Sequence, residues 1–282
     1  MKNIKKVRRT PEIIGLIIVI FLFVIMMLPL FWMFSCSLKL NTDIFKTPPV
    51  IFPRHPTLDP YITQLFNESF SILASLKNSM IIAVATTVIA TVLSIPAAYG
   101  VARFNFKFKR AIIFIFLVTQ MLPSVFTLIP NFIIFKKIGV YNTYWAPILA
   151  DCTLGIPFCV LMLRPYFISI PKEIEDAARI DGCGALRVFL QIVTPIVSTG
   201  IVVAVVFSFL FGYGDMVNAL TFINEQSLWP VTTGIYNCVG RYGIRWNEAM
   251  AFGVMAVIPV VAIFLLMQKY VVAGLIGGAV KG

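Results

Sequence analysis

Six long apolar stretches dominate this sequence and restrict what it can fold into. They run approximately from Ile13 to Leu38, Ser79 to Ala102, Ala111 to Phe135, Thr143 to Leu163, Ile196 to Asn218 and Met250 to Val271. A helix rises about 1.5 Å per residue, so roughly 20 apolar residues cross a bilayer core of about 30 Å. Hydrophobic residues make up 59% of the 282 residues and charged residues only 12%, which is unlike a soluble domain. The sequence therefore predicts an all-α polytopic membrane protein with six transmembrane helices.

Basic residues give the expected orientation. The first apolar stretch follows a basic N-terminal segment, as a cleaved signal sequence does, but it is too long and lacks a small-residue cleavage site. We therefore interpret it as the first span. With the N terminus inside, the inner segments hold 15 of the 23 Lys and Arg residues and the longer outer segments hold 8. Because cytoplasmic loops carry the excess of basic residues, both termini are predicted to be cytoplasmic.

The sequence contains no pattern for nucleotide, metal or disulfide chemistry. A GxxxxGK[ST] phosphate loop is absent, so we expect any ATP chemistry to come from another chain. The five cysteines have no metal-binding spacing, and the single histidine, His55, lies in the first outer loop. The net charge of +11 follows from the basic inner segments and does not require nucleic acid. We expect no catalytic residues, no metal and no cofactor bound by this chain.

A polar segment from Pro171 to Pro195, PKEIEDAARIDGCGALRVFLQIVTP, lies on the predicted cytoplasmic side. Proline suits the first turn of a helix, and acidic residues follow it at the positive end of the helix dipole. Gly182 can turn the backbone left-handed, so this helix is predicted to end near Asp181. A second apolar stripe then leads to the fifth span: Leu186, Phe189, Leu190 and Val193. The segment is predicted to form a helix, a glycine turn and a second helix.

The first of these helices has two interpretations. Ile174, Ala177 and Ala178 are predicted to share one face, where small side chains allow a neighbouring protein to approach closely. The alternative is an amphipathic linker on the lipid surface. Interfacial helices are usually strongly basic on the polar face, whereas this helix is rich in acids. The charge pattern therefore favours docking into a protein groove.

The same segment resembles the EAA loop of ABC importer permeases. The pattern aligns with Asp176, Ala177, Ala178, Gly182, Ile192 and Pro195. Aspartate replaces the usual glutamate, with Glu175 beside it, and Thr194 replaces a leucine. Other stretches resemble the carbohydrate-uptake, maltose-type permeases: LKNS at Leu76–Ser79, AAYGVARF at Ala97–Phe104 and QKYVVAGLIGGAVKG at Gln268–Gly282.

This resemblance implies a type I ABC importer permease in a prokaryotic cell (inner or cytoplasmic) membrane. It implies residues 1–75 as an N-terminal helix with an outer loop, and residues 76–282 as a core with the coupling loop at about 168–195. The implied solute is a sugar or oligosaccharide, with a non-sugar solute as the alternative. The implied partners are a second, non-identical six-helix permease, two cytoplasmic ATPases that use ATP and Mg, and an extracytoplasmic solute-binding protein. Six residues are implied to couple the chain to the ATPases: Glu175, Asp176, Ala177, Ala178, Asp181 and Gly182.

Polar residues inside the spans are candidates for a translocation pathway, because they are costly to bury in lipid. Gln120, Asn131 and Asp151 lie in the third and fourth spans. Asp151 has a second interpretation, since it lies near the predicted outer end of its helix and could simply reach water or a neighbouring donor.

The outer segment from Thr221 to Asn247 is long and polar, with glycines among aromatic residues. It could contact a docked binding protein through Tyr236, Asn237 and Gly240. The alternative is an interfacial aromatic belt on the membrane surface.

Two other functional classes remain open. An ATP-independent secondary carrier would often show an inverted repeat and paired intramembrane charges, neither of which is evident here. A membrane scaffold for a soluble enzyme would also use the inner loop.

Overall fold

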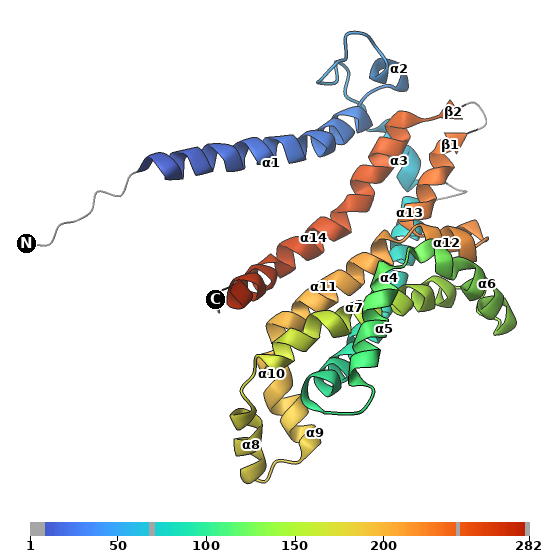
Figure 1. Ribbon diagram of the computed structural model, residues 1–282. Helices are drawn as coiled ribbons and strands as arrows, with labels where there is room; N and C mark the ends of the chain where they lie inside the picture. Colours follow the sequence, from blue (N-terminus) through green and yellow to red (C-terminus); the bar gives the residue numbers. More distant parts are fainter. Residues whose placement is uncertain (1–8, 68–70, 241–242, 280–282) are drawn as a thin grey trace, which may run out of the picture. The chain divides into compact units, whose positions relative to one another are not determined.

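The computed structural model describes residues 9–67, 71–240 and 243–279, and it forms two compact units. The first unit is Met1–Glu68 with Asn237–Met255, and the second is Ser69–Tyr236 with Ala256–Gly282 (Figure 1). The basic N-terminal residues 1–8 used to predict the orientation lie outside the described residues. Helices make up nearly all the regular structure, and a short β-hairpin in the outer segment is an addition that the sequence did not predict.

The first unit contains α1 (Arg9–Ser37), α2 (Asn41–Ile44), α3 (Asp59–Leu65), the hairpin of β1 (Val239–Gly240) and β2 (Gly243–Ile244), and the beginning of α14 (Trp246–Ala279). Polar contacts join its separate chain segments. The backbone N–H of Trp246 donates to Asn41 Oδ1 at 3.0 Å, and Gln64 Nε2 donates to Glu248 Oε2 at 2.9 Å. The most apolar window of α1 has no buried residue, so its side chains are available to lipid or to another chain.

The core of the second unit is formed by α4 (Ile72–Arg103), α7 (Trp145–Ile168) and α11 (Ser198–Gly214), which lie side by side in Figure 1. Small side chains allow these helices to approach closely. A Cβ added at Gly212 of α11 would lie 3.0 Å from Ala83 Cα of α4. Ser94 of α4 donates to the Ile156 carbonyl of α7 at 3.1 Å. The core is therefore joined by close packing and interhelical hydrogen bonds, as expected for helices in a membrane.

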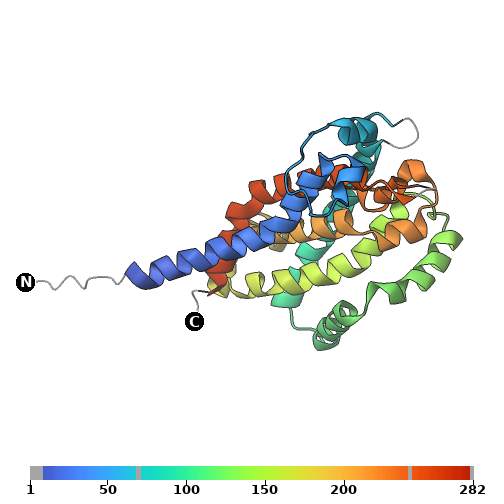
Figure 2. The same cartoon turned by 90° about the horizontal axis from the view of Figure 1, so that it is seen from above.

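The third apolar stretch is a bent pair of helices, so it agrees with the predicted span only if the pair crosses the membrane together. It forms α5 (Lys109–Met121), the 3-10 turn η1 (Ser124–Thr127) and α6 (Leu128–Lys137), with a bend of 106° (Figure 2). The backbone of Leu122 is extended, and Pro123 follows it. The residue before a proline is disfavoured in helical geometry, which explains the break at this point.

The fifth apolar stretch is also shorter than predicted. The inner segment contains α8 (Lys172–Ile180), α9 (Ala185–Arg187), the π-helical turn η2 (Val188–Val193) and α10 (Thr194–Ile196), and the chain bends by 78° before α11. Helix α11 ends at Gly214, and Asp215 is extended. The outer segment continues as α12 (Val217–Phe222), η3 (Gln226–Leu228), α13 (Val231–Gly234) and η4 (Ile235–Cys238).

Among the described residues, four helices are long and apolar enough to cross a membrane, and the number rises to six if each bent pair is one span. The four are α1, α4, α7 and α14, and the bent pairs are those of the third and fifth stretches. The all-α membrane fold predicted from the sequence is confirmed, while two of its spans are broken helices.

Candidate functional site

Helix α8 and the turn after it lie at one end of the second unit, beyond the ends of α7 and α11 (Figure 1). The helix begins at Lys172, one residue after Pro171, and its C-cap is Asp181. Gly182 has a φ of +83°, its N–H donates to the Arg179 carbonyl, and the Cys183 N–H donates to the Ala178 carbonyl, both at 3.0 Å. This pair of hydrogen bonds is a Schellman motif, in which the left-handed residue is usually glycine. The predicted glycine turn is confirmed.

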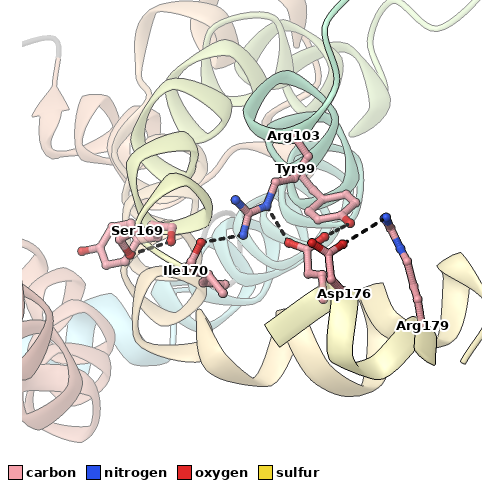
Figure 3. Close-up of polar contacts among 8 residues, drawn as sticks. Tyr99, Arg103, Ser169, Ile170, Asp176 and Arg179 are labelled. Atoms are coloured by element: carbon pink, nitrogen blue, oxygen red, sulfur yellow. Dashed lines mark hydrogen bonds and ion pairs between the residues drawn. The ribbon is translucent and has the colours of Figure 1, made fainter. Parts of the chain in front are cut away.

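A buried ion pair fixes α8 to α4. Glu175 Oε1 lies 2.6 Å from Arg103 Nε, and the two side chains are only 6% and 9% exposed. Arg103 also donates to the Ile170 carbonyl at 2.8 Å, and the Tyr99 hydroxyl donates to Glu175 Oε2 at 2.9 Å (Figure 3). Glu175 Oε1 and Arg103 Nε therefore form an ion pair, and Glu175 Oε2 and a second guanidinium nitrogen form hydrogen bonds within this chain. We call Tyr99, Arg103 and Glu175 the clamp.

Tyr99 connects the clamp to the hydrophobic core. Its ring makes edge contacts with Phe104 and Phe167, with centroids 6.0 Å and 5.6 Å away, and lies 4.9 Å from the ring of Phe189 in η2. One side chain of α4 thus contacts α7, α8 and η2. Each aromatic contact of this kind stabilises the fold by about 0.5–1.5 kcal/mol, in addition to the contribution from the apolar area that it buries.

The two faces of α8 differ from the sequence-based prediction. Ala178 is 7% exposed and packs in the core with Val188, whereas Ala177 is exposed. Ala178 therefore does not share a surface with Ala177, because the buried face of α8 contains Glu175 and Ala178, whereas Ile174 is 39% exposed. Ile180, which the prediction omitted, is 86% exposed.

The acidic residues of α8 divide in the same way. Glu175 points inward to Arg103, while Asp176 is exposed and lies 3.6 Å from Arg179 on the same helix. Asp181 is exposed as well. The two neighbouring carboxylates that the sequence left undecided thus have different environments, one inside the chain and one facing outward.

Sequence reasoning missed Tyr99 and Arg103 as members of this site. They lie in the AAYGVARF stretch, which served only as a family signature. Their separation of four residues places them on one helix face, directly before a predicted inner loop. That spacing could have indicated a polar contact, but only the tertiary structure identifies Glu175 as the partner.

The pathway candidates do not form one cluster. Gln120 donates to the Leu154 carbonyl of α7 at 3.1 Å, and Asn131 lies on α6 with a buried side-chain nitrogen that has no partner in the described structure. Asp151 of α7 is 5% exposed and accepts a hydrogen bond from Asn218 Nδ2 at 3.0 Å. Asp151 is therefore closed to water, and it reaches a neighbouring donor, as its second interpretation allowed.

A pocket of about 330 Å³ lies beside Asp151, with Asp215 and Asn218 in its wall. Asp215 Oδ2 accepts from the backbone N–H groups of Asn218 and Ala219 at 2.9 Å and 3.2 Å, which stabilises the first turn of α12. Sequence reasoning missed Asp215 and Asn218, because both lie at the end of the fifth stretch, where polar residues are ordinary.

The outer candidates lie where the two units divide along the chain. Tyr236 is 46% exposed in η4, Asn237 is the next residue, and Gly240 pairs with Gly243 in the hairpin. The hairpin tip at residues 241–242 lies outside the described residues. In the part of the chain that is described, no group of three or more His, Cys, Asp or Glu residues could hold a metal ion.

Comparisons with known proteins identify the family. The family described as binding-protein-dependent transport system inner membrane component matches residues 90–277 of this chain. The trehalose transport system permease protein SugB of Mycobacterium tuberculosis is 34% identical, covering 91% of this chain and 93% of its own. The sulfoquinovosyl glycerol transport system permease protein SmoH of Agrobacterium fabrum is 31% identical, with coverages of 90% and 88%.

A solved structure gives the fold. A chain of a bacterial ABC transporter that imports the acidic polysaccharide alginate superposes with a TM-score of 0.78 at 17% identity, covering 96% of this chain and all of that one. The ABC importer permease family predicted from the sequence is confirmed. The chain belongs to the family of binding-protein-dependent transport system inner membrane components, and it is the membrane-spanning permease subunit of an ABC importer whose ATPase is a separate subunit.

Proposed function

We propose that this permease subunit imports a sugar or oligosaccharide and that α8 couples it to the ATPase. Relatives with about a third of their residues identical carry names of sugar transport systems, which supports the solute class. The observation that carries the coupling role is the clamp. It attaches α8 rigidly to α4 and leaves the opposite face of α8, with Asp176, Ala177 and Ile180, exposed to a partner.

The proposed mechanism follows from this division of the helix. When the ATPases close on ATP, they move α8, and the buried ion pair transmits the displacement to α4 because a buried charge pair resists separation. Helix α4 packs along α7 and α11, so the movement reaches the core of the unit. Asp181 and Gly182 set the direction of the chain after α8, and Glu175 and Ala178 act from inside as supports.

The remaining assembly is proposed from the family. The importer would contain a second, non-identical six-helix permease, two cytoplasmic ATPases that use ATP and Mg, and an extracytoplasmic binding protein, in the cell membrane of a prokaryote. Residues 76–282 would form the permease core, and the region of Tyr236, Asn237 and Gly240 would contact the binding protein. Gln120, Asn131 and Asp151 remain candidates for the pathway.

An uptake panel tests the solute class. Cells that express the complete importer are supplied with radiolabelled trehalose, maltose or galactobiose, and with amino acids as non-sugar solutes. We expect saturable, ATP-dependent accumulation of at least one disaccharide and none of the amino acids. Accumulation of an amino acid alone would favour the non-sugar alternative.

Gly182→Asp tests the coupling role. Aspartate at a φ of +83° strains the turn and adds a charge, so we expect uptake to fall at least about tenfold while the protein still inserts into the membrane. Gly184→Asp is the matched control, because Gly184 has a φ of −67° and open space around its Cα. Normal uptake by Gly182→Asp would overturn the proposal.

Ile180→Glu tests the exposed face separately. Ile180 is 86% exposed, so the substitution leaves the interior of this chain intact but places a charge on the surface that α8 presents. We expect the ATPase to be lost when the importer is purified through a tag on this chain. Retention of the ATPase in wild-type amounts would show that it contacts another surface.

A further inference from the structure

The short connection between α4 and α5 has an unusual pattern of side chains. Residues 104–108 separate the end of α4 at Arg103 from the start of α5 at Lys109, and together with the next two residues they read FNFKFKR. We call residues 104–110 the basic loop. It contains three phenylalanines and three cations, phenylalanine and lysine alternate from 106 to 109, and no residue in it is acidic.

The basic loop lies at a membrane surface, on the same side as α8. Helix α4 is long and apolar enough to cross a membrane, and its apolar sequence continues to Ala102, directly before the loop. Arg103 forms the ion pair with Glu175 of α8, so the loop and α8 lie at one end of the second unit (Figure 1). The assignment of this end to the cytoplasm rests on the proposed coupling role of α8.

The phenylalanines of the basic loop are not used in the protein core. Phe104, Phe106 and Phe108 are 57%, 41% and 66% exposed. Exposure of three large apolar side chains to water is unfavourable, whereas the boundary between lipid headgroups and acyl chains stabilises them. Their exposure beside the end of a membrane-spanning helix therefore indicates contact with lipid.

The cations of the basic loop form no ion pair within the described residues. Lys109 Nζ donates to the Phe104 carbonyl at 3.1 Å, and Lys107 Nζ lies 5.9 Å from the centroid of the Phe108 ring. None of the ion pairs includes Lys107, Lys109 or Arg110. The first turn of α5 also lacks an acid, although a helix dipole favours negative charge there. The positive charge of the loop is therefore left to attract an anion from outside the chain.

We propose that the basic loop binds the headgroups of anionic phospholipids in the cytoplasmic leaflet. Lys107, Lys109 and Arg110 contact the phosphates, and the phenylalanines lie against the adjoining acyl chains. Basic residues close to the cytoplasmic end of a span are attracted to anionic lipid, and each of them adds to the affinity. An acidic surface of the ATPase would match the charge as well, but it would not account for the exposed phenylalanines.

The first test measures lipid binding by the complete importer, purified in detergent and titrated with phosphatidylglycerol or phosphatidylcholine in native mass spectrometry. The variant carries Lys107→Gln, Lys109→Gln and Arg110→Gln together. We expect the dissociation constant for phosphatidylglycerol to rise at least about tenfold, and that for phosphatidylcholine to change less than about twofold. The ATPase should still copurify, because the variant leaves α8 and the clamp intact.

A matched control removes the same number of exposed cations from the predicted outer segments. It carries Arg54→Gln, Lys136→Gln and Lys137→Gln together. We expect its affinity for phosphatidylglycerol to stay within about twofold of wild type, because these residues lie outside the basic loop.

The second test identifies the neighbour of the basic loop directly. Phe106 is replaced by the photoreactive analogue p-benzoylphenylalanine, which keeps an aromatic ring at this exposed position. The importer is reconstituted in nanodiscs that contain equal amounts of phosphatidylglycerol and phosphatidylcholine. We expect cross-links to phosphatidylglycerol to exceed those to phosphatidylcholine at least about threefold, and the excess to disappear when the three cations are replaced.

Three results would overturn the inference. The first is equal affinity of the triple variant and the wild type for phosphatidylglycerol, and the second is equal affinity of the wild type for both lipids. The third is a cross-link from position 106 to the ATPase, or loss of the ATPase from the triple variant, either of which would place the loop in the coupling interface. Normal uptake by Gly182→Asp would instead remove the coupling role of α8 and leave the lipid measurements standing, so the two proposals fail separately.

Discussion

The clamp and the Asp151 pocket each contain a buried carboxylate in the second unit. The two carboxylates differ in the number and the charge of the groups that contact them. In the clamp, both oxygens of Glu175 have partners, from Arg103 and Tyr99. In the pocket, Asp151 has one neutral amide donor and one oxygen with none. In the clamp, an ion pair and a hydrogen bond to one carboxylate hold two helices together, whereas the carboxylate of Asp151 has a single neutral donor.

The energetic consequence is that the two sites respond differently to the loss of a charge. Removing one partner of a buried ion pair leaves the other charge unpaired and costs about 3–5 kcal/mol. Removing a buried charge whose only hydrogen-bond donor is a neutral amide relieves a desolvation penalty instead. Substitutions can therefore separate a carboxylate that stabilises the fold from one that does not.

The largest effect is expected from Arg103→Ala. It leaves Glu175 buried without its cation, so the free energy of unfolding should fall by about 3–5 kcal/mol. The loss can be measured by thermal unfolding of the detergent-purified protein, with Arg179→Ala as the matched control. Arg179 forms an exposed pair with Asp176, and such pairs contribute about 1 kcal/mol or less. Equal stability of the two variants would contradict a structural role for the clamp.

A smaller loss is expected from Tyr99→Phe. The substitution keeps the aromatic contacts with Phe104, Phe167 and Phe189 and removes only the hydrogen bond to Glu175. A hydrogen bond to a charged group contributes about 1.5–3 kcal/mol. Combining Tyr99→Phe with Glu175→Gln in a double-mutant cycle should give less than the sum of the single losses. Additive losses would mean that the hydroxyl does not act through Glu175.

The smallest effect on stability, and one of opposite sign to that in the clamp, is expected from Asp151→Asn. We expect its free energy of unfolding to equal or exceed that of wild type by up to about 1 kcal/mol, because a poorly paired buried charge is removed. Glu175→Gln should destabilise the protein under the same conditions. If Asp151→Asn destabilised the protein as much as Glu175→Gln, the contrast between the two sites would fail.

The sequence predicted the loop well because its signals are local. Pro171, Gly182 and the acids between them each restrict a few neighbouring residues, so the helix and its left-handed exit could be placed to within a residue. The orientation of that helix could not be predicted in the same way. Ala177 and Ala178 are chemically identical, and only packing against Val188 and the rest of the core decides that Ala178 is inside.

The broken spans show a second limit of the sequence. Pro123 could be seen in the third stretch, but proline also occurs inside continuous helices of this chain, such as Pro96 in α4. Mean hydropathy over a window depends only on which residues the window contains, so it cannot reveal the bend of 106°. The hydrogen-bond partner of Asp151, Asn218, lies at the end of another stretch, 67 residues away, so no local pattern could link them.

The sequence by itself determined that this protein is a helical membrane permease with an inner coupling loop, because apolar length, charge bias and family motifs are properties of the linear chain. The tertiary structure alone decided which of two adjacent acids is buried and which is exposed, and which polar side chains meet around a pocket. The physical reason is that burial and pairing depend on which helices pack together, and in α4, α7 and α11 small side chains at the contacts make that choice.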